Sequence, residues 1–95
     1  MSKLVRDLIP RFARGRVFSN LTDKDEYRKA LLDKLVEEAF EVRESNADAE
    51  ELADVYEVLE AIVAEWEHDI RHIKAEQTHK RRVKGGFRNG VFMYD

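Results

Sequence analysis

Apolar residues recur at steps of three and four positions along two stretches of the chain, and this spacing predicts two long helices. The first is expected over residues 23–44, with an apolar stripe of Tyr27, Leu31, Leu35 and Val42. The second is expected over residues 48–82, with a seam of Leu52, Val55, Leu59, Ile62, Trp66, Ile70 and Ile73, widened by Tyr56, Val58 and Val63. The polar residues between them predict that the chain turns back near Asn46 and forms an antiparallel helical hairpin.

The ends of these helices carry capping signals. Thr22 and Asp25 have the spacing of a capping box at the start of the first helix. Either Asn46 or Asp48 could cap the second helix, because both side chains can accept hydrogen bonds from free backbone N–H groups. The glycine pair at residues 85–86 is expected to end it.

Shorter elements flank the two helices. Residues 3–14 are expected to form a short N-terminal element, although Pro10 leaves its conformation open. Residues 87–94 are expected to form a loop with a short strand or hairpin, because Asn89-Gly90 is a turn signal ahead of an apolar run.

Together these elements predict one all-α domain over residues 1–95, an antiparallel helical hairpin with a short N-terminal element and a C-terminal loop or short strand. Two helices cannot cover all of the apolar side chains, since Tyr56, Val63, Trp66 and Ile70 exceed what one partner helix can bury. We therefore expect a homodimer whose hairpins pack as a four-helix arrangement.

Composition limits the location and the partners of the chain. It contains no Cys, so it has neither a disulfide framework nor a thiolate metal site, which fits a cytoplasmic protein. No apolar run approaches the roughly 20 residues that span a bilayer, and no signal-peptide pattern opens the chain. We therefore expect no membrane partner.

The net charge of −3 hides a segregation of charge along the chain. Residues 37–60 hold ten acidic side chains and one basic one. Residues 1–16 hold five basic side chains and one acidic side chain. Residues 71–88 hold seven basic side chains and one acidic side chain. The middle could hold a cation and the two ends an anion, as a metal-bound polyphosphate requires; the alternative is a set of solvated helix faces.

Two pairs of carboxylates have a spacing that suits a metal site. Glu38 and Glu41 are three residues apart, so they share one face of the first helix. Glu51 and Asp54 have the same spacing on the second helix, and the two pairs are mirror images about Asn46. An antiparallel hairpin would bring the four carboxylates together, where each like-charge pair at ~4 Å costs about 4 kcal/mol. A hard divalent cation, Mg²⁺ or alternatively Mn²⁺, would relieve that cost; the other interpretation is an acidic hairpin facing solvent.

Two side chains on the first helix lie beside this quartet. Glu37 could be an outer ligand or the base that orients a water molecule, and equally a glutamate that faces solvent. Lys34 is one turn before Glu38, so it could reach a phosphate or form an ordinary ion pair with that carboxylate.

A basic run near the C-terminus is a candidate phosphate site. Lys80, Arg81 and Lys84 precede two glycines, and glycine lets backbone N–H groups approach an anion. Basic residues also favour the C-terminal end of a helix, so capping and solubility are the alternative. Nucleic acid is a weaker partner, because the chain is acidic overall and shows no aromatic platform.

Three histidines are the other candidate ligands. His68 and His72 are four residues apart and could share a metal, but no acidic third ligand other than Asp69 or Glu65 has an obvious spacing. We interpret them, with His79, as surface or interface residues.

The motifs resemble those of the MazG-like, all-α nucleoside triphosphate pyrophosphohydrolases, which include phosphoribosyl-ATP pyrophosphohydrolase and helical dUTPases. The matching segments are Glu37-Glu38-Ala39-Phe40-Glu41 and Glu51-Leu52-Ala53-Asp54. The opening and closing segments resemble a subgroup described as phosphoribosyl-ATP pyrophosphohydrolase-like. These are Lys3-Leu4-Val5-Arg6-Asp7-Leu8-Ile9-Pro10 and Lys84-Gly85-Gly86-Phe87.

The resemblance implies an enzyme that uses Mg²⁺ and water to cleave the α–β linkage of a nucleoside triphosphate, which releases a monophosphate and pyrophosphate. The metal ligands it implies are Glu38, Glu41, Glu51 and Asp54. Catalysis is assigned to Glu37, Glu38 and Glu41, and substrate phosphate to Lys34, Lys80, Arg81, Lys84 and Arg6. The family also implies a dimer or a higher assembly of helical hairpins.

The resemblance leaves the substrate open. The gap between Glu41 and Glu51 is short for the family, so the turn must be tight, and the chain ends differ from those of histidine-pathway enzymes. Ordinary or damaged nucleoside triphosphates, in a house-cleaning role, are therefore as plausible as phosphoribosyl-ATP. The competing interpretation is a non-catalytic module that binds nucleotide or another protein.

Overall fold

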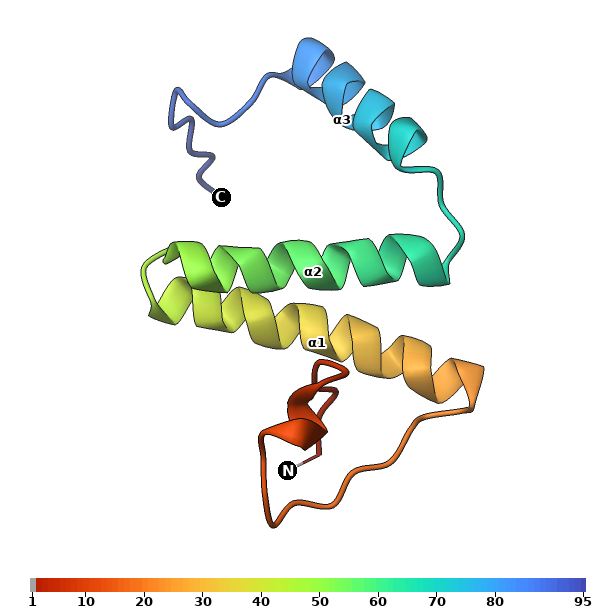
Figure 1. Cartoon of the computed structure of the whole chain (residues 1–95). Coiled ribbons are helices and arrows are strands. Elements are labelled where there is room, and N and C mark those ends of the chain that lie inside the picture. The colour runs from red at the N-terminus through yellow and green to blue at the C-terminus, as the bar shows by residue number, and fades with distance from the viewer. Residues whose placement is uncertain (1) are drawn as a thin grey trace.

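The computed structural model describes residues 2–95, and all of its regular structure is helical. In chain order the elements are a 3-10 helix η1 (Ile9–Arg11) and the α-helices α1 (Lys24–Glu44), α2 (Ala49–Glu65) and α3 (Ile70–Lys84). Figure 1 shows α1 and α2 side by side and antiparallel, with the N-terminal segment on one side of the pair and α3 apart from it. The predicted all-α class is thus confirmed, and the contact between α1 and α2 is consistent with the predicted helical hairpin.

α1 begins one residue later than predicted and uses a different cap. Asp23 is the capping residue, and its carboxylate accepts hydrogen bonds from the backbone N–H groups of Asp25 (2.8 Å) and Glu26 (3.1 Å). The predicted capping box that starts at Thr22 is therefore wrong. Asp23 stands at the N-cap position itself, so its carboxylate satisfies two free N–H groups of the first turn.

The turn between α1 and α2 is tight and lies where the sequence predicts it. Asn46 (φ 58°) and Ala47 (φ 64°) both adopt left-handed conformations, and the Ala47 N–H donates back to the Val42 carbonyl at 2.8 Å. This backbone bond closes the end of α1. Asp48 then caps α2, since its carboxylate accepts from the Glu50 N–H at 3.1 Å. Of the two predicted caps, Asp48 is the one used.

The interface between α1 and α2 forms a small core. Leu31 is 2% exposed and Val58 is 8% exposed, and they are the two buried hydrophobic residues in the described part of the chain. Tyr27, Leu35 and Val42 of the predicted α1 stripe are half-buried beside them. The predicted stripe of α1 therefore faces α2.

The predicted seam of α2 is only partly correct. Val55 and Ile62 are half-buried, but Leu52 and Leu59 are 39% and 41% exposed, while Val58 is the most buried residue of the helix. Apolar spacing therefore identifies only part of the side of α2 that packs on α1. Leu52 and Leu59 belong to a second apolar side, which stays partly open in the described residues.

The single long helix predicted over residues 48–82 is wrong, because the chain breaks between α2 and α3. Glu67 adopts a left-handed conformation (φ 56°), and the His68 N–H donates to the Val63 carbonyl at 3.0 Å, which ends α2. Asp69 then caps α3 by accepting from the Arg71 N–H at 2.9 Å. The break has no glycine or proline signal, so the continuous apolar spacing concealed it.

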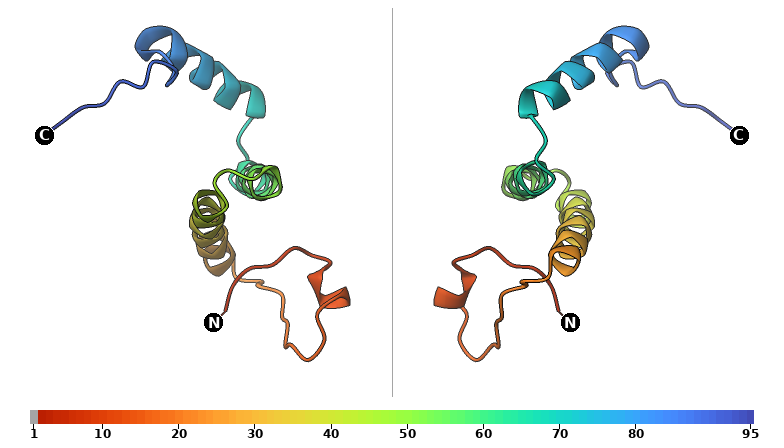
Figure 2. Two further views of the ribbon diagram at one scale, coloured as in Figure 1. Left: turned by 90° about the vertical axis from the view of Figure 1, so that its left-hand side faces the viewer. Right: turned by 90° about the vertical axis from the view of Figure 1, so that its right-hand side faces the viewer.

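The two ends of the chain carry little regular structure. The N-terminal element is a single 3-10 turn at Ile9–Arg11 that contains Pro10, and the rest of that segment is extended or bent. After Gly85 (φ 85°), which ends α3 as predicted, residues 86–95 form a loop with a turn at Asn89. The predicted C-terminal strand is absent from the described residues. Figure 2 shows the C-terminal segment extending away from the hairpin.

No helix within residues 2–95 has the length and apolar character needed to cross a bilayer. In the described chain α1 and α2 are also the one pair of helices in substantial contact. The predicted four-helix arrangement requires a second chain and stays a prediction.

Candidate metal centre

The tight turn brings carboxylates from both helices of the hairpin together. Glu38 of α1 and Glu51 and Asp54 of α2 each offer an oxygen atom, and these atoms lie within 4.8 Å of one another. We call these three residues the carboxylate cluster. Glu38 is 6% exposed, and the other two are half-buried. Three of the four ligands predicted from sequence therefore lie close together.

Glu41, the fourth predicted ligand, lies outside this group of three. It occupies the next turn of α1 and is exposed. Its negative charge still acts on Glu51, whose pKa it helps to raise. Glu41 therefore borders the cluster, at a position from which a rotamer change or a bridging water could bring it to an ion.

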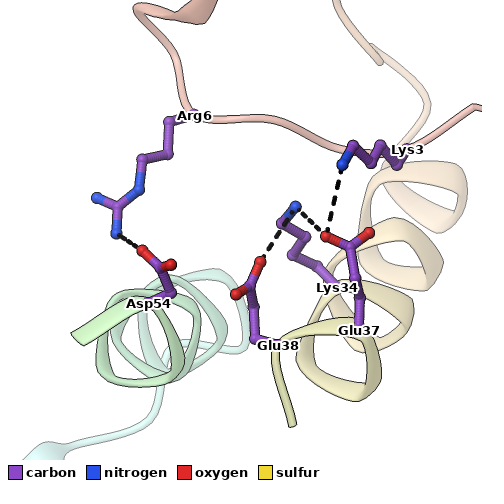
Figure 3. Close-up of polar contacts among 6 residues, drawn as sticks. All are labelled: Lys3, Arg6, Lys34, Glu37, Glu38 and Asp54. Atoms are coloured by element: carbon purple, nitrogen blue, oxygen red, sulfur yellow. Dashed lines mark hydrogen bonds and ion pairs between the residues drawn. The ribbon is translucent and has the colours of Figure 1, made fainter. Parts of the chain in front are cut away.

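Basic side chains already contact the cluster from two directions, as Figure 3 shows. Arg6 of the N-terminal segment donates to Asp54 at 2.7 Å, and the Lys34 ammonium lies 3.3 Å from Glu38. Lys34 also donates to Glu37 at 2.6 Å, and Lys3 lies 3.9 Å from the same carboxylate. The sequence interpretation had singled out Arg6 and Lys34 but missed Lys3, for which only the basic character of the segment gave a signal.

The contacts between Lys34 and its glutamate neighbours shift the pKa values of Glu37 and Lys34 in opposite directions. The hydrogen bond from Lys34 lowers the pKa of Glu37, which therefore stays ionised. Burial is the largest influence on Lys34 and acts to lower its pKa, but the bonds to Glu37 and Glu38 outweigh it and leave that pKa raised. The two groups stabilise each other as an ion pair.

Glu51 is in the opposite situation. Its pKa is raised, first by desolvation and then by repulsion from Asp54, Glu41 and Glu38. None of the ion pairs in the described chain includes Glu51 or Glu41. The site therefore has spare negative charge beside Glu51.

Counting charges shows how much negative charge is left. The carboxylates are Glu37, Glu38, Glu41, Glu51 and Asp54, and the basic side chains in contact with them are Lys3, Arg6 and Lys34. Among these groups five negative charges stand against three positive ones, and Asp48 adds to the repulsion on Glu51. A divalent cation would offset this excess of negative charge, and an all-oxygen donor set suits Mg²⁺ or Mn²⁺.

The remaining candidates lie away from the site within one chain. Lys80, Arg81 and Lys84 are exposed in the last turns of α3, which has no substantial contact with the hairpin. Figure 1 shows this helix apart from the end of the hairpin that holds the turn. The three histidines are exposed as well, which agrees with the surface position expected for them.

The other end of the hairpin is held by a separate polar contact. Arg28 of α1 donates to the Glu65 carboxylate at 3.0 Å and lies over the Trp66 ring, 4.9 Å from its centroid. This contact fixes the end of α2 against the start of α1. It therefore supports the alignment of the two helices on which the carboxylate cluster depends.

Comparison with known proteins gives no match for this chain, either to a family model, to a curated protein or to a solved structure.

Proposed function

We propose that this chain is a Mg²⁺-dependent hydrolase of nucleoside triphosphates, acting at the α–β phosphate linkage to release a monophosphate and pyrophosphate. The observation that carries the proposal is the carboxylate cluster, in which oxygens of Glu38, Glu51 and Asp54 lie within 4.8 Å of one another. The resemblance of the two carboxylate motifs to MazG-like pyrophosphohydrolases supplies the reaction class.

The carboxylate cluster and Glu41 would hold the ion on the side where negative charge is in excess. Mg²⁺ held there would neutralise phosphate charge and lower the pKa of a water molecule. Glu37 is held by Lys34 and its pKa is lowered, which makes it a poor general base. Glu37 would instead keep Lys34 in position.

Arg6 and Lys34 have a second role in this proposal. In the structure both neutralise carboxylates of the site, with contacts of 2.7 Å to Asp54 and 3.3 Å to Glu38. A cation bound at the cluster would release these side chains electrostatically, because it neutralises the same carboxylates. Each side chain could then bind a phosphate oxygen and stabilise the charge of the departing pyrophosphate.

The test is pyrophosphate release from a panel of nucleoside triphosphates and phosphoribosyl-ATP, with Mg²⁺ and with chelator. We expect metal-dependent release of pyrophosphate, rather than orthophosphate, from at least one member. The Glu38→Gln variant should lose that activity by about 100-fold or more, because it removes a ligand and half of an ion pair.

Glu26→Gln is the matched control, since Glu26 is an exposed glutamate in the first turn of α1, outside the cluster. It should leave the rate unchanged. Absence of release from every substrate by folded protein, with Mg²⁺ and with Mn²⁺, would contradict the proposal.

A second function is favoured by a different observation. The chain exposes many large hydrophobic side chains, among them Phe40 (53%) and Tyr56 (68%) on the hairpin. Such a surface also fits a non-catalytic nucleotide-binding or helical protein-interaction module. The Glu41→Gln change separates the two functions: it should abolish turnover by an enzyme and leave association unchanged, whereas a scaffold should only gain stability as repulsion falls.

A further inference from the structure

The last third of the chain has almost no support from the rest of the chain. Residues 67–95, which we call the C-terminal arm, are all exposed except Ile73, which is half-buried. α3 has 15 residues, and an isolated helix of that length is marginal in water. A helix in this situation requires a surface to pack against, and its own hairpin does not provide one.

The arm is directed away from its own hairpin by a fixed connection. Trp66 is held under Arg28, and the His68 N–H bonds the Val63 carbonyl at 3.0 Å across the left-handed Glu67. Asp69 then caps α3. Hydrogen bonds on both sides of the break therefore set the direction of α3, and Figure 2 shows that it projects beyond α2.

The size of the chain shows how much surface a partner has to cover. The radius of gyration is 16.7 Å, whereas a compact domain of this length has a radius of about 12 Å. The accessible area is 9141 Å², whereas a folded monomer of this mass exposes roughly 5,700 Å². The excess of roughly 3,400 Å² per chain exceeds what each partner buries in most obligate dimers.

Charge indicates what the partner is. The last turns of α3 carry Lys80, Arg81 and Lys84, none of which forms an ion pair within residues 2–95. The hairpin carries the opposite charge: ten acidic residues and one basic residue over residues 37–60, with Glu57 and Glu60 exposed on α2. A second copy of this chain therefore presents a surface complementary to the arm.

We propose that two chains exchange their C-terminal arms. The α3 of each chain then docks on the acidic residues 37–60 in the hairpin of the other chain. The exchange forms two identical contacts and closes as a twofold symmetric dimer. It places Lys80, Arg81 and Lys84 of one chain near the carboxylate cluster of its partner. If the proposed function holds, these side chains complete the phosphate site in trans, which explains why one chain alone keeps them apart from the cluster.

The first test measures association without metal or nucleotide, so it does not depend on catalysis. Wild-type protein should have a mass twice that of the 11.2 kDa chain. The arm variant Lys80→Glu/Arg81→Glu/Lys84→Glu should raise the dimer dissociation constant by about 100-fold or more, because like charges then face each other. The hairpin variant Glu50→Lys/Glu57→Lys/Glu60→Lys should raise the dimer dissociation constant by a similar factor.

Mixing these two variants decides whether the contact is in trans. The acidic arm then faces a basic hairpin, and the basic arm faces an acidic one, so we expect a heterodimer to form although neither variant dimerises alone. The control Arg11→Glu/Arg14→Glu/Arg16→Glu makes the same change in net charge in the N-terminal segment and should leave dimerisation unchanged. Circular dichroism verifies that each variant keeps its helices.

Three outcomes would overturn the proposal: a wild-type monomer well above micromolar concentration, equal effects of the arm variant and its control, or no heterodimer on mixing. A monomer that binds oligonucleotides through the arm, with a steep dependence on salt, would likewise overturn it and assign the arm to nucleic acid.

Activity then tests the role of the arm at the site. Glu38→Gln and Lys80→Ala/Arg81→Ala/Lys84→Ala should each be inactive alone, and mixing them should restore pyrophosphate release, because one site in the mixed dimer has both parts intact. No recovery in a mixed dimer would refute the trans site. If wild-type protein releases no pyrophosphate, the proposed function fails while the association result still stands.

Discussion

The hairpin and the C-terminal arm follow the same sequence rules but reach different states. Both are helical and capped by an aspartate, Asp48 for α2 and Asp69 for α3. The hairpin is closed by a bonded turn and a small core around Leu31 and Val58, whereas within residues 2–95 the arm has no substantial contact with the hairpin. Apolar spacing and an aspartate cap therefore suffice to define where a helix forms. Packing against another surface is what stabilises that helix in the folded protein.

The largest effect is expected in the core of the hairpin. Leu31→Ala should lower the free energy of unfolding by about 2–4 kcal/mol, because Leu31 is 2% exposed and its removal leaves a cavity. Val83→Ala in the arm should change it by less than about 0.5 kcal/mol in monomeric protein, since Val83 is 64% exposed. Urea denaturation at low protein concentration measures both. Equal effects would show that the arm has intrachain support.

The next effect concerns the buried ion pair of the hairpin. Lys34→Met should destabilise the metal-free protein by about 1–3 kcal/mol at neutral pH, because it leaves the carboxylate of Glu38, which is 6% exposed, without its partner. Lys29→Met is the control on the same helix: its pair with Asp33 is exposed, so its effect should stay below about 0.5 kcal/mol.

The pH dependence of that variant has a definite sign. Lys34 lowers the pKa of Glu37, so the ion pair contributes stability above the unfolded pKa of a glutamate, about 4.3, and loses it as pH falls through the lowered value. The difference between Lys34→Met and wild type should therefore shrink on acidification. A difference that stays constant down to low pH would contradict the assignment.

A weaker effect, opposite in sign, is expected at Glu51. Its pKa is raised by desolvation and by repulsion from neighbouring carboxylates, so the ionised group costs stability above the raised value, and this cost disappears below the unfolded pKa. Glu51→Gln should raise the melting temperature of metal-free protein at neutral pH and abolish any further rise on adding Mg²⁺. Glu60→Gln, outside the cluster, should do neither. A Glu51→Gln variant that Mg²⁺ still stabilises would remove Glu51 from the ligand set.

The smallest effect concerns the turn that aligns the two halves of the site. Ala47 adopts φ 64°, a conformation that favours glycine, so Ala47→Gly should raise the free energy of unfolding by about 0.5–1 kcal/mol. Ala49→Gly, two residues later at the start of α2, should lower it by a similar amount. Thermal unfolding of the two variants measures the difference, and a loss of stability in Ala47→Gly would contradict the strain assigned to the turn.

The sequence predicts the hairpin well because its signals are local. Helical spacing, the polar turn and the aspartate cap act within a few residues, and the turn lies at Asn46 as expected. The break before α3 was missed because Glu67, which adopts the left-handed conformation there, gives no signal of its own in the sequence. The exposure of Leu52 and Leu59 was not predicted, because apolar spacing shows that a helix has an apolar face but not which element packs against that face.

The candidate site divides in the same way. Mirror spacing about the turn suffices to place Glu38, Glu51 and Asp54 together, since helix geometry fixes it. Spacing does not place Lys3 or Arg6 at the site, because the N-terminal segment reaches it by tertiary contact, at 3.9 Å from Glu37 and 2.7 Å from Asp54. Nor does it say where Lys80, Arg81 and Lys84 dock, because that depends on a second chain.

The most direct measurement is a titration of the wild-type protein with Mn²⁺, followed by electron paramagnetic resonance and by competition with Mg²⁺. The carboxylate cluster predicts one saturable divalent ion per chain, displaced by Mg²⁺ and lost in Glu51→Gln but not in Glu60→Gln. Absence of saturable binding to folded protein, or equal binding by both variants, would contradict the metal centre on which the proposed activity depends.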